Sequence, residues 1–409
     1  MVRFKHGHTK DYLRRSAIVS QARSVAQHGG RIEPVKSPRL YATHAPLALA
    51  ALLAACASPE PAPEPPLLRP AEARARIAEL LPAQLADRAG WATDIHAALT
   101  SLRIAPTASN ICAVLAITEQ ESTFRADPSV PGMAAIAWRQ IEQRAQRAGV
   151  PMLVVRTALA LSSPTGASYA ERIDKAKTER DLSETFDDFI GMVPLGQRLF
   201  AQWNPVRTGG PMQVSVEFAQ QHVQTRPYPY PVDGSLRREV FSRRGGLYFG
   251  IAHLLDYPAG YDRMLYRFAD FNAGQHASRN AALQNAITTA SGIPLAPDGD
   301  LIRRDGSKQA GSTETALRSI ADRLRMSESA IRSDLELGDG PQLASSTVWQ
   351  RVFALADRAE GRALPRAVVP QIDLHSPKIT RPLTTAWFAR RVDERYQRCL
   401  LRADQAASR

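Results

Sequence analysis

From residue 67 onward, apolar side chains recur with the spacing of amphipathic α-helices rather than with the alternation of strands. Such stretches run through 71–81 and 93–102 and are interrupted by proline and glycine, which end helices. We find little strand-like alternation and no internal repeat. The pattern therefore predicts a mainly α-helical protein.

The segment 110–121 predicts a helix capped near Ser109 or Asn110, with Glu121 at the end of its apolar face. Three residues precede Glu121 by seven, four and three positions and share its side of the helix: Val114, Ile117 and Thr118. A carboxyl group on such a face loses hydration and holds its proton more strongly, as a general acid near neutral pH must. Glu119 lies about 200° away around the helix and is expected to face solvent.

A mostly helical block is predicted over 133–208. Gly209, Gly210 and Pro211 then mark a loop. Because proline fits only the first turn of a helix, a new helix is expected to begin there. This interpretation places Gln213 at a loop-to-helix junction.

Two more helices are predicted over 246–257 and 260–272, separated by Pro258. On the second, three residues share the face of Asn272: Leu265, Phe268 and Ala269. The Asn272 amide is therefore expected to be buried just before Gly274, which is a good helix C-cap. A buried amide needs hydrogen-bond partners, which another loop or a ligand must supply.

Charge is distributed unevenly along the 409 residues. The net charge is +12, but residues 1–44 contribute +7 of it. The rest of the chain is only mildly basic, which suits an anionic polymer and gives no indication of nucleic-acid binding. A hydrophobic content of 44% suffices for a buried core, and no apolar run is long enough to cross a bilayer.

The apolar stretch 45–55 follows basic residues and has the length of a secretory signal core. It ends in Leu53-Ala54-Ala55-Cys56, which matches the bacterial lipoprotein box. Cys56 is therefore expected to be diacylated on its thiol and to become the new N-terminus. A proline-rich tether follows at 58–66. Ala57, where Asp would indicate inner-membrane retention, favours an outer-membrane anchor that faces the periplasm.

The predicted organisation of the N-terminal region is a signal region over 1–55 and a lipidated cysteine with its tether over 56–70. Residues 1–34 place the signal core unusually far from the start. We interpret them as a mis-assigned start, with translation beginning at Val35.

Cys112 and Cys399 are the two cysteines beyond the lipoprotein box. After export both would lie in an oxidising compartment, where they could pair. Two buried thiols are an equally open alternative, because the sequence gives no distance between them.

Three short motifs follow one another along the chain: Glu121-Ser122-Thr123-Phe124, Gly210-Pro211-Met212-Gln213-Val214 and Asp270-Phe271-Asn272-Ala273-Gly274. Together they resemble the lytic transglycosylases and goose-type lysozymes. The catalytic domain of these enzymes has Glu-Ser at a helix end, then a Gly-Leu-Met-Gln loop, then Ala-Tyr-Asn-Ala-Gly at the end of a later helix. The resemblance covers about 109–275. It implies a lysozyme-like domain (α+β lysozyme superfamily) over 71–292, with a helical insertion at about 133–208 and a helical C-terminal extension over 293–409.

The resemblance implies a role for each matched residue. Glu121 would be the acid/base, Ser122 would orient it, and the others would bind the sugar or wall the groove: Met212, Gln213, Phe271 and Asn272. Such enzymes cut the β-1,4 bond between MurNAc and GlcNAc in peptidoglycan. One glutamate protonates the leaving oxygen and then takes the proton of the C6 hydroxyl of the muramic acid, which yields anhydro-muropeptides.

Three departures from the family pattern leave alternatives open. The insertion separates the first two motifs widely, Pro211 replaces a leucine, and Phe271 replaces the tyrosine whose hydroxyl approaches the catalytic glutamate. A hydrolytic muramidase is one alternative. It would need a second carboxylate, for which the candidates are Asp127, Glu217 and Asp270. A non-catalytic peptidoglycan-binding or scaffolding lipoprotein is the other alternative.

No metal or cofactor is predicted. The histidines that could be considered lack metal-ligand spacing: His222, His253 and His276. The segment 315–337 predicts a helix, a short turn and a helix. Export excludes a DNA-binding helix-turn-helix, and the lack of flanking strands disfavours a glycan-binding LysM module, so a plain helical hairpin is predicted.

Overall fold

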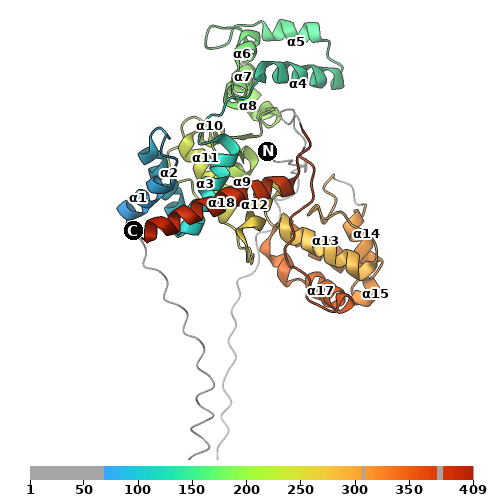
Figure 1. Cartoon of the computed structure of the whole chain (residues 1–409). Helices are drawn as coiled ribbons and strands as arrows, with labels where there is room; N and C mark the ends of the chain where they lie inside the picture. The colour runs from blue at the N-terminus through green and yellow to red at the C-terminus, as the bar shows by residue number, and fades with distance from the viewer. Residues whose placement is uncertain (1–68, 306–308, 375–380, 409) are drawn as a thin grey trace, which may run out of the picture. The chain divides into compact units, whose positions relative to one another are not determined.

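The structure of the protein is a computed structural model that describes residues 69–305, 309–374 and 381–408. Helices account for 63% of this structure. The predicted mainly α-helical class is therefore confirmed (Figure 1). The predicted signal region, Cys56 and most of the tether fall within 1–68 and lie outside the described residues. In the described ranges, no helix is both long enough and apolar enough to cross a membrane.

The largest hydrophobic core is built around α3 (Ala108–Ser122), whose residues 111–118 are all buried. Helices from distant parts of the chain contribute to this core: α1 (Pro70–Leu80), α2 (Arg88–Ser101), α9 (Val216–Thr225), α10 (Leu236–Phe241), α11 (Arg243–Leu255), α12 (Met264–Ala273) and α18 (Thr385–Ala407). The helices predicted at 71–81 and 93–102 are confirmed as α1 and α2.

Two helices begin earlier than predicted, because a hydroxyl side chain ahead of the first turn accepts a hydrogen bond from it. Thr107 accepts from the backbone N–H of Asn110 at 3.1 Å, so Thr107 and not Asn110 caps α3. Ser242 accepts from the N–H of Gly245 at 3.0 Å, so α11 starts ahead of Gly246.

The helix predicted from residue 260 begins later, at Met264. Tyr261 lies in the loop ahead of it, and its hydroxyl donates to the carboxylate of Asp270 at 2.6 Å. This bond ties the loop to the C-terminal part of α12, and the loop residues do not extend the helix toward its N-terminus. The predicted C-terminus is confirmed, since Gly274 caps α12.

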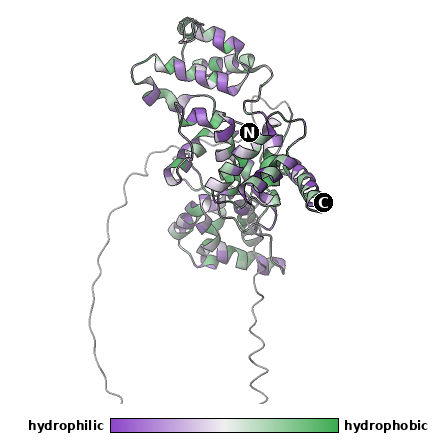
Figure 2. Ribbon diagram, turned by 90° about the vertical axis from the view of Figure 1, so that its left-hand side faces the viewer, coloured by the Kyte–Doolittle hydropathy of each residue, from purple (hydrophilic) through white to green (hydrophobic). Residues whose placement is uncertain are grey.

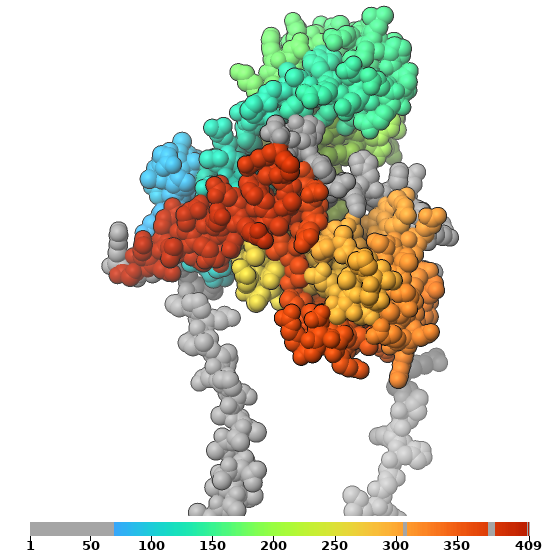
Figure 3. Space-filling view, turned by 45° about the vertical axis from the view of Figure 1, so that its right-hand side comes forward, coloured from blue at the N-terminus to red at the C-terminus, as the bar shows by residue number. Residues whose placement is uncertain are grey.

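The last helix, α18, packs against both α3 and α12 (Figure 1). Its outer side remains on the surface (Figure 3), and its inner side supplies the core with Phe388, Ala389, Val392, Tyr396, Cys399 and Ala403. Cys399 forms a disulfide with Cys112 of α3. The predicted boundary at residue 293 therefore does not separate α18 from the core that holds Glu121.

The predicted insertion is helical: α4 (Met133–Arg147), α5 (Met152–Leu159), α6 (Tyr169–Lys175), α7 (Glu179–Gly191), α8 (Gly196–Phe200) and the 3-10 helix η2 (Ala201–Trp203). It has a small hydrophobic cluster of its own around Tyr169. The N–H of Val130, in the segment after α3, donates to the carbonyl of Lys177 at 2.8 Å. Arg180 of α7 donates to the carbonyl of Phe241 in α10. These bonds tie the insertion to both the end of α3 and the main core.

A two-stranded antiparallel hairpin follows the insertion, formed by β1 (Thr208–Gly209) and β2 (Val214–Ser215). The predicted loop-to-helix junction is therefore wrong, since Pro211 lies in the turn between strands. The helix begins only after Ser215, whose hydroxyl accepts from the N–H of Phe218 at 3.2 Å. Strands of two residues are too short to show an alternating pattern in the sequence.

A second hydrophobic cluster lies C-terminal to α12 and is formed by α13 (Ala277–Ser291), α14 (Ser312–Arg318), α15 (Ala321–Leu324), α16 (Glu328–Glu336), the 3-10 helices η3 (Leu337–Asp339) and η4 (Pro341–Ser345), and α17 (Thr347–Glu360). The predicted two-helix hairpin over 315–337 is thus three short helices. Fully buried Glu314 accepts from Arg318 at 2.6 Å and from Arg332 at 2.7 Å, which joins α14 to α16. A buried carboxylate needs such paired partners.

Candidate functional site at the ends of α3, the hairpin and α12

Glu121 lies in the last turn of α3, just before an abrupt change of chain direction. Thr123 and Phe124 both adopt left-handed backbone conformations, with φ of 53° and 57°. This region is unfavourable for residues with side chains and most of all for β-branched ones such as threonine. The buried ring of Phe124 packs edge-on against Trp91 at 5.8 Å and so holds the turn in place. Packing therefore fixes a strained helix end that carries Glu121.

Ser122 closes this helix end. Its hydroxyl donates to the carbonyl of Thr118 at 3.1 Å and accepts from the N–H of Arg125 at 3.2 Å. The serine is buried, whereas Glu121 is partly exposed. Ser122 thus positions Glu121 through the backbone that both residues share, in addition to the direct orienting role that the resemblance implies.

Glu119 was predicted to face solvent, and its side chain is 40% exposed, although it also has a partner in the protein. It lies 3.3 Å from Nε of Arg395, whose side chain is only 15% exposed. Burial lowers the pKa of Arg395, and the charge of Glu119 opposes that shift. The sequence did not predict this ion pair, because Arg395 comes from α18, which packs against α3. As a result, a largely buried cation lies on α18 beside the last turns of α3.

Gln213 occupies the hairpin turn in a left-handed conformation with φ of 50°. It is buried, and both its backbone N–H and its Nε2 donate to the carbonyl of Gly210, at 3.1 and 3.2 Å. Met212 is fully buried, so it does not wall an open groove as expected. The Met212 side chain fits against Gly250 of α11, because glycine has no Cβ. A Cβ at position 250 would lie only 2.5 Å from the Cβ of Met212. Met212 thus anchors the hairpin in the core.

Asn272 ends α12 and is buried, as its spacing predicted. Its Oδ1 accepts a hydrogen bond from the hydroxyl of Thr385 at 2.8 Å. Its Nδ2 has no hydrogen-bond partner among the described residues. A buried donor left unpaired costs about 1–3 kcal/mol. An unpaired donor at this buried position is therefore unusual in a folded protein.

A second unpaired polar atom lies beside the same motif. The rings of Phe271 and His253 pack edge-on, 5.1 Å apart. Nε2 of His253 is 3.2 Å from the carbonyl of Phe271, which requires Nε2 to carry the proton and to donate. Nδ1 of His253 has no partner among the described residues. The two unpaired buried atoms, one acceptor and one donor, thus belong to a residue that packs on the ring of Phe271 and to the residue that follows it in sequence.

The three candidate histidines stay neutral at pH 7, because burial lowers the pKa of each to about 4: His222, His253 and His276. Within the described ranges, no three His, Cys, Asp or Glu side chains gather closely enough to hold a metal ion.

Asp270, a candidate second carboxylate, is fully buried and used as a structural cap. It accepts four hydrogen bonds of 2.6–3.0 Å, from the hydroxyls of Tyr257 and Tyr261 and from the backbone N–H groups of His276 and Ser278. Burial raises the pKa of Asp270, and the four donors oppose the rise. Its lone pairs cap the start of α13, which leaves it unsuited to act as a reaction base.

The other two carboxylates have contrasting surroundings. Asp127 follows the end of α3 and lies 3.7 Å from Nε of Arg180 in the insertion. Burial raises the pKa of Asp127, against the opposing charge of Arg180. Glu217 is exposed in the first turn of α9. Of the three candidates, Asp127 is the half-buried carboxylate close in sequence to Glu121.

All three motifs are fixed to the same hydrophobic core by neighbouring residues, namely Ile117, Phe124, Met212, Val214 and Phe271. Sequence reasoning missed Thr385 and Arg395, which α18 brings to the motif helices. The amphipathic pattern of 385–407 and the position of Cys399 on its apolar face are the signals that could have identified this helix as part of the core.

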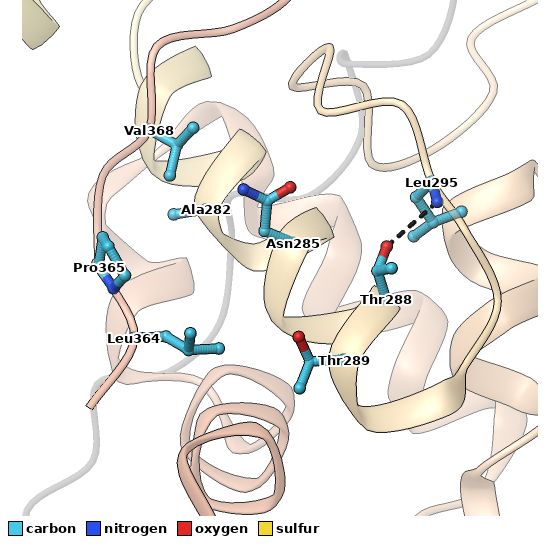
Figure 4. A pocket seen from close by; sticks show the side chains of 8 residues that line it. All are labelled: Ala282, Asn285, Thr288, Thr289, Leu295, Leu364, Pro365 and Val368. Atoms are coloured by element: carbon cyan, nitrogen blue, oxygen red, sulfur yellow. Dashed lines mark hydrogen bonds between the residues drawn. The ribbon is translucent and has the colours of Figure 1, made fainter. Parts of the chain in front are cut away.

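Two pockets lie outside the three motifs. One of about 290 Å³ lies between α13 and the segment 364–368 (Figure 4), where the hydroxyl of Thr288 accepts from the N–H of Leu295 at 3.1 Å. The other, of about 500 Å³, lies along the first turns of α18 and is lined by Arg381, Thr384, Ala386, Trp387, Arg390, Arg391 and Glu394. The lining of the second pocket includes both sequence neighbours of Thr385 but not the buried Thr385 itself.

Comparison with known proteins gives two matches. Residues 84–402 match the family described as "Protein of unknown function (DUF1615)". The chain is 51% identical over 370 residues to the protein of Escherichia coli (strain K12) named "Uncharacterized protein YaiW", a match that covers 90% of this chain and 99% of that protein. No solved structure matches the chain.

Proposed function

We propose that this chain, which belongs to the DUF1615 family, cleaves the glycan strands of peptidoglycan as a lytic transglycosylase with a lysozyme-like catalytic domain. The proposal rests on the resemblance of three motifs to the lytic transglycosylases and goose-type lysozymes. Glu121 would act as the acid/base at the MurNAc–GlcNAc bond.

The observation that carries the proposal is the strained backbone at two of the three motifs. Three non-glycine residues have left-handed conformations: Thr123 and Phe124, two and three positions after Glu121, and Gln213 in the hairpin turn. Such conformations persist only where the surrounding structure enforces them, and they concentrate at functional sites. The unpaired Nδ2 of Asn272 supports the same assignment for the third motif.

The proposed reaction needs one proton donor that later accepts a proton. Glu121 would protonate the glycosidic oxygen as the bond breaks, and the leaving GlcNAc would take that proton. The Glu121 carboxylate would then remove the proton of the C6 hydroxyl of MurNAc, whose oxygen bonds to C1. The product is a 1,6-anhydro ring, and no water is consumed. A second carboxylate is not required for this reaction, which agrees with the use of Asp270 as a cap.

A non-catalytic peptidoglycan-binding protein is the second candidate, and one group of observations favours it. The side-chain Nε2 of Gln213 donates to Gly210 within its own turn, and Met212 is fully buried. Two residues that the resemblance assigns to the groove are thus engaged inside the protein. Phe271 also favours the non-catalytic candidate, because it lacks the hydroxyl with which the tyrosine of the resembled family approaches the catalytic glutamate.

Analysis of the released products tests the proposal. Purified protein is incubated with intact sacculi, and soluble muropeptides are analysed by mass spectrometry. We expect products with anhydro ends, about 18 Da lighter than hydrolytic products because no water is added across the glycosidic bond. Reducing ends would contradict transglycosylation and indicate a muramidase. Binding to sacculi without soluble products would favour the non-catalytic alternative.

The lipoprotein box motivates a separate proposal, that Cys56 carries a lipid anchor in the outer membrane. We expect the Cys56→Ala variant to be released from outer-membrane fractions by a high-salt wash, whereas the wild type stays. The measurement is immunoblotting of washed fractions. Wild-type protein whose N-terminal peptide has the mass of an unmodified chain would contradict the assignment.

A further inference from the structure

Large hydrophobic side chains on the surface are concentrated in the insertion. Nine lie between residues 150 and 203: Val150, Leu153, Val154, Leu161, Met192, Val193, Leu195, Leu199 and Trp203. The remaining described residues contribute four: Val232, Ile293, Leu337 and Leu401. Exposed apolar side chains gathered in this way mark a binding surface.

The first exposed segment is α5, which is apolar on both sides. Its inner residues Val155 and Leu159 pack in the hydrophobic cluster of the insertion. Its outer residues Leu153 and Val154 are 77% and 57% exposed. The hydrophobic stretches of the insertion can be followed in Figure 2. Nothing among the described residues covers the outer side of α5.

The second exposed segment runs from Met192 through α8 to Trp203. It is linked to the C-terminal turns of α4, because Nη1 of Arg144 donates to the carbonyl of Trp203 at 3.2 Å. The first segment is joined to the same turns through the chain, since Val150 follows shortly after Arg147. The end of α4 therefore connects the two apolar segments.

A group of arginines accompanies these segments. Arg144, Arg147 and Arg207 are exposed, and none forms an ion pair with a carboxylate of the described residues. Desolvation and the charges of Arg207 and Arg147 lower the pKa of Arg144, and the Arg144 side chain donates to the carbonyl of Trp203, four residues before Arg207. The cluster is thus an uncompensated positive charge beside an exposed tryptophan.

We propose that the insertion binds the surface of a bilayer that contains anionic phospholipid. The side chains of α5 and of the Met192–Trp203 segment would enter the boundary between headgroups and acyl chains, and the arginines would contact lipid phosphates. Tryptophan at this level is typical of membrane-bound proteins. The inference goes beyond glycan cleavage and uses none of the residues of the Glu121 site.

The chemistry of the surface favours lipid over other partners. Eight of its nine apolar residues are aliphatic, which suits hydrocarbon, whereas sugars stack on aromatic rings. A second copy of the chain, paired through this surface about a two-fold axis, would place two copies of the arginine cluster at one interface, and like charges at an interface repel. A Cys56 anchor would also hold the domain within about 45 Å of a membrane, the reach of a fully extended tether.

Binding of the unacylated full chain to vesicles tests the inference. The Cys56→Ala protein is floated with vesicles of phosphatidylethanolamine and phosphatidylglycerol (3:1), and with phosphatidylcholine alone as the neutral reference. We expect binding to the anionic vesicles and a blue shift of Trp203 emission, identified by its loss in Trp203→Phe. Adding Leu153→Asp and Leu199→Asp should weaken binding at least about tenfold, because both leucines lose their contact with hydrocarbon.

Matched changes elsewhere serve as controls. Leu401→Asp replaces a leucine of α18 that is 62% exposed, between Leu199 at 52% and Leu153 at 77%, and should leave vesicle binding unchanged. Replacing Arg144, Arg147 and Arg207 by Gln should abolish the preference for anionic vesicles. The inference is overturned if Leu153→Asp with Leu199→Asp binds vesicles as Cys56→Ala does. It is also overturned if the variant with Leu153→Asp and Leu199→Asp keeps its vesicle binding and loses only self-association or only binding to sacculi.

Discussion

Glu121→Gln is expected to lower the release of soluble muropeptides by about 10²- to 10⁴-fold or more, the contribution of a general acid/base. The substitution keeps the size and most hydrogen bonds of the side chain but can neither donate nor recover a proton. Glu121 lies at a helix end held by the left-handed residues Thr123 and Phe124, so the fold should tolerate the change. The rate is measured on intact sacculi, with circular dichroism and a melting curve to verify folding.

The control for this experiment must be a glutamate without a structural partner. Glu119 is unsuitable, because its ion pair with Arg395 links α3 to α18. Glu217 is exposed in the first turn of α9, and Glu217→Gln should retain activity within about twofold. If folded Glu121→Gln cleaves sacculi as fast as Glu217→Gln, Glu121 is not the acid/base.

Removing the disulfide is expected to lower the free energy of unfolding by about 2–5 kcal/mol. The bond between Cys112 and Cys399 closes a loop of 287 positions, which restricts the unfolded chain, and it joins two core helices. The Cys112→Ala/Cys399→Ala variant is compared with the wild type by urea denaturation. Its unfolding midpoint should fall, since alanine fills part of each buried site but cannot cross-link.

The reducing agent provides the matched control. Dithiothreitol should shift the unfolding midpoint of the wild type toward that of the double variant and leave the double variant unchanged. A wild-type midpoint that does not move, although both thiols become titratable, would show that the bond adds no stability.

Local patterns predicted part of the site correctly. The burial of Asn272 followed from the apolar residues three, four and seven positions before it, and α3 ends beside Glu121 as its face indicated. These features depend on helical periodicity within one turn or two, which is written in adjacent residues. The mainly α-helical class was accessible for the same reason.

Other parts depend on contacts that no local pattern encodes. The hairpin that holds Gln213 has strands of two residues, and the glycine on which Met212 packs lies in another helix, α11. Asp270 matched a motif but serves the start of α13, because Tyr257 and Tyr261 fold back onto it. Tertiary packing decided each of these cases.

The place of α18 was the largest departure from the expected organisation. Its residues Thr385 and Arg395 contact the motif helices from more than a hundred positions away in sequence. Separation of this size leaves no trace in hydrophobic periodicity. The amphipathic pattern of 385–407 and the position of Cys399 on its apolar face indicated a core helix, but they did not say which helices it packs against.

The dependence of α3 on α18 also sets a timetable for biosynthesis. At translation rates of about 5–20 residues per second, the 287 positions between Cys112 and Cys399 take roughly 15–60 s to synthesise. During that interval the nascent chain has its Glu121 helix but not the helix that covers it. The three motifs therefore remain without Thr385 and Arg395 until the last segment is made, and a chain that stops before residue 385 cannot complete the site.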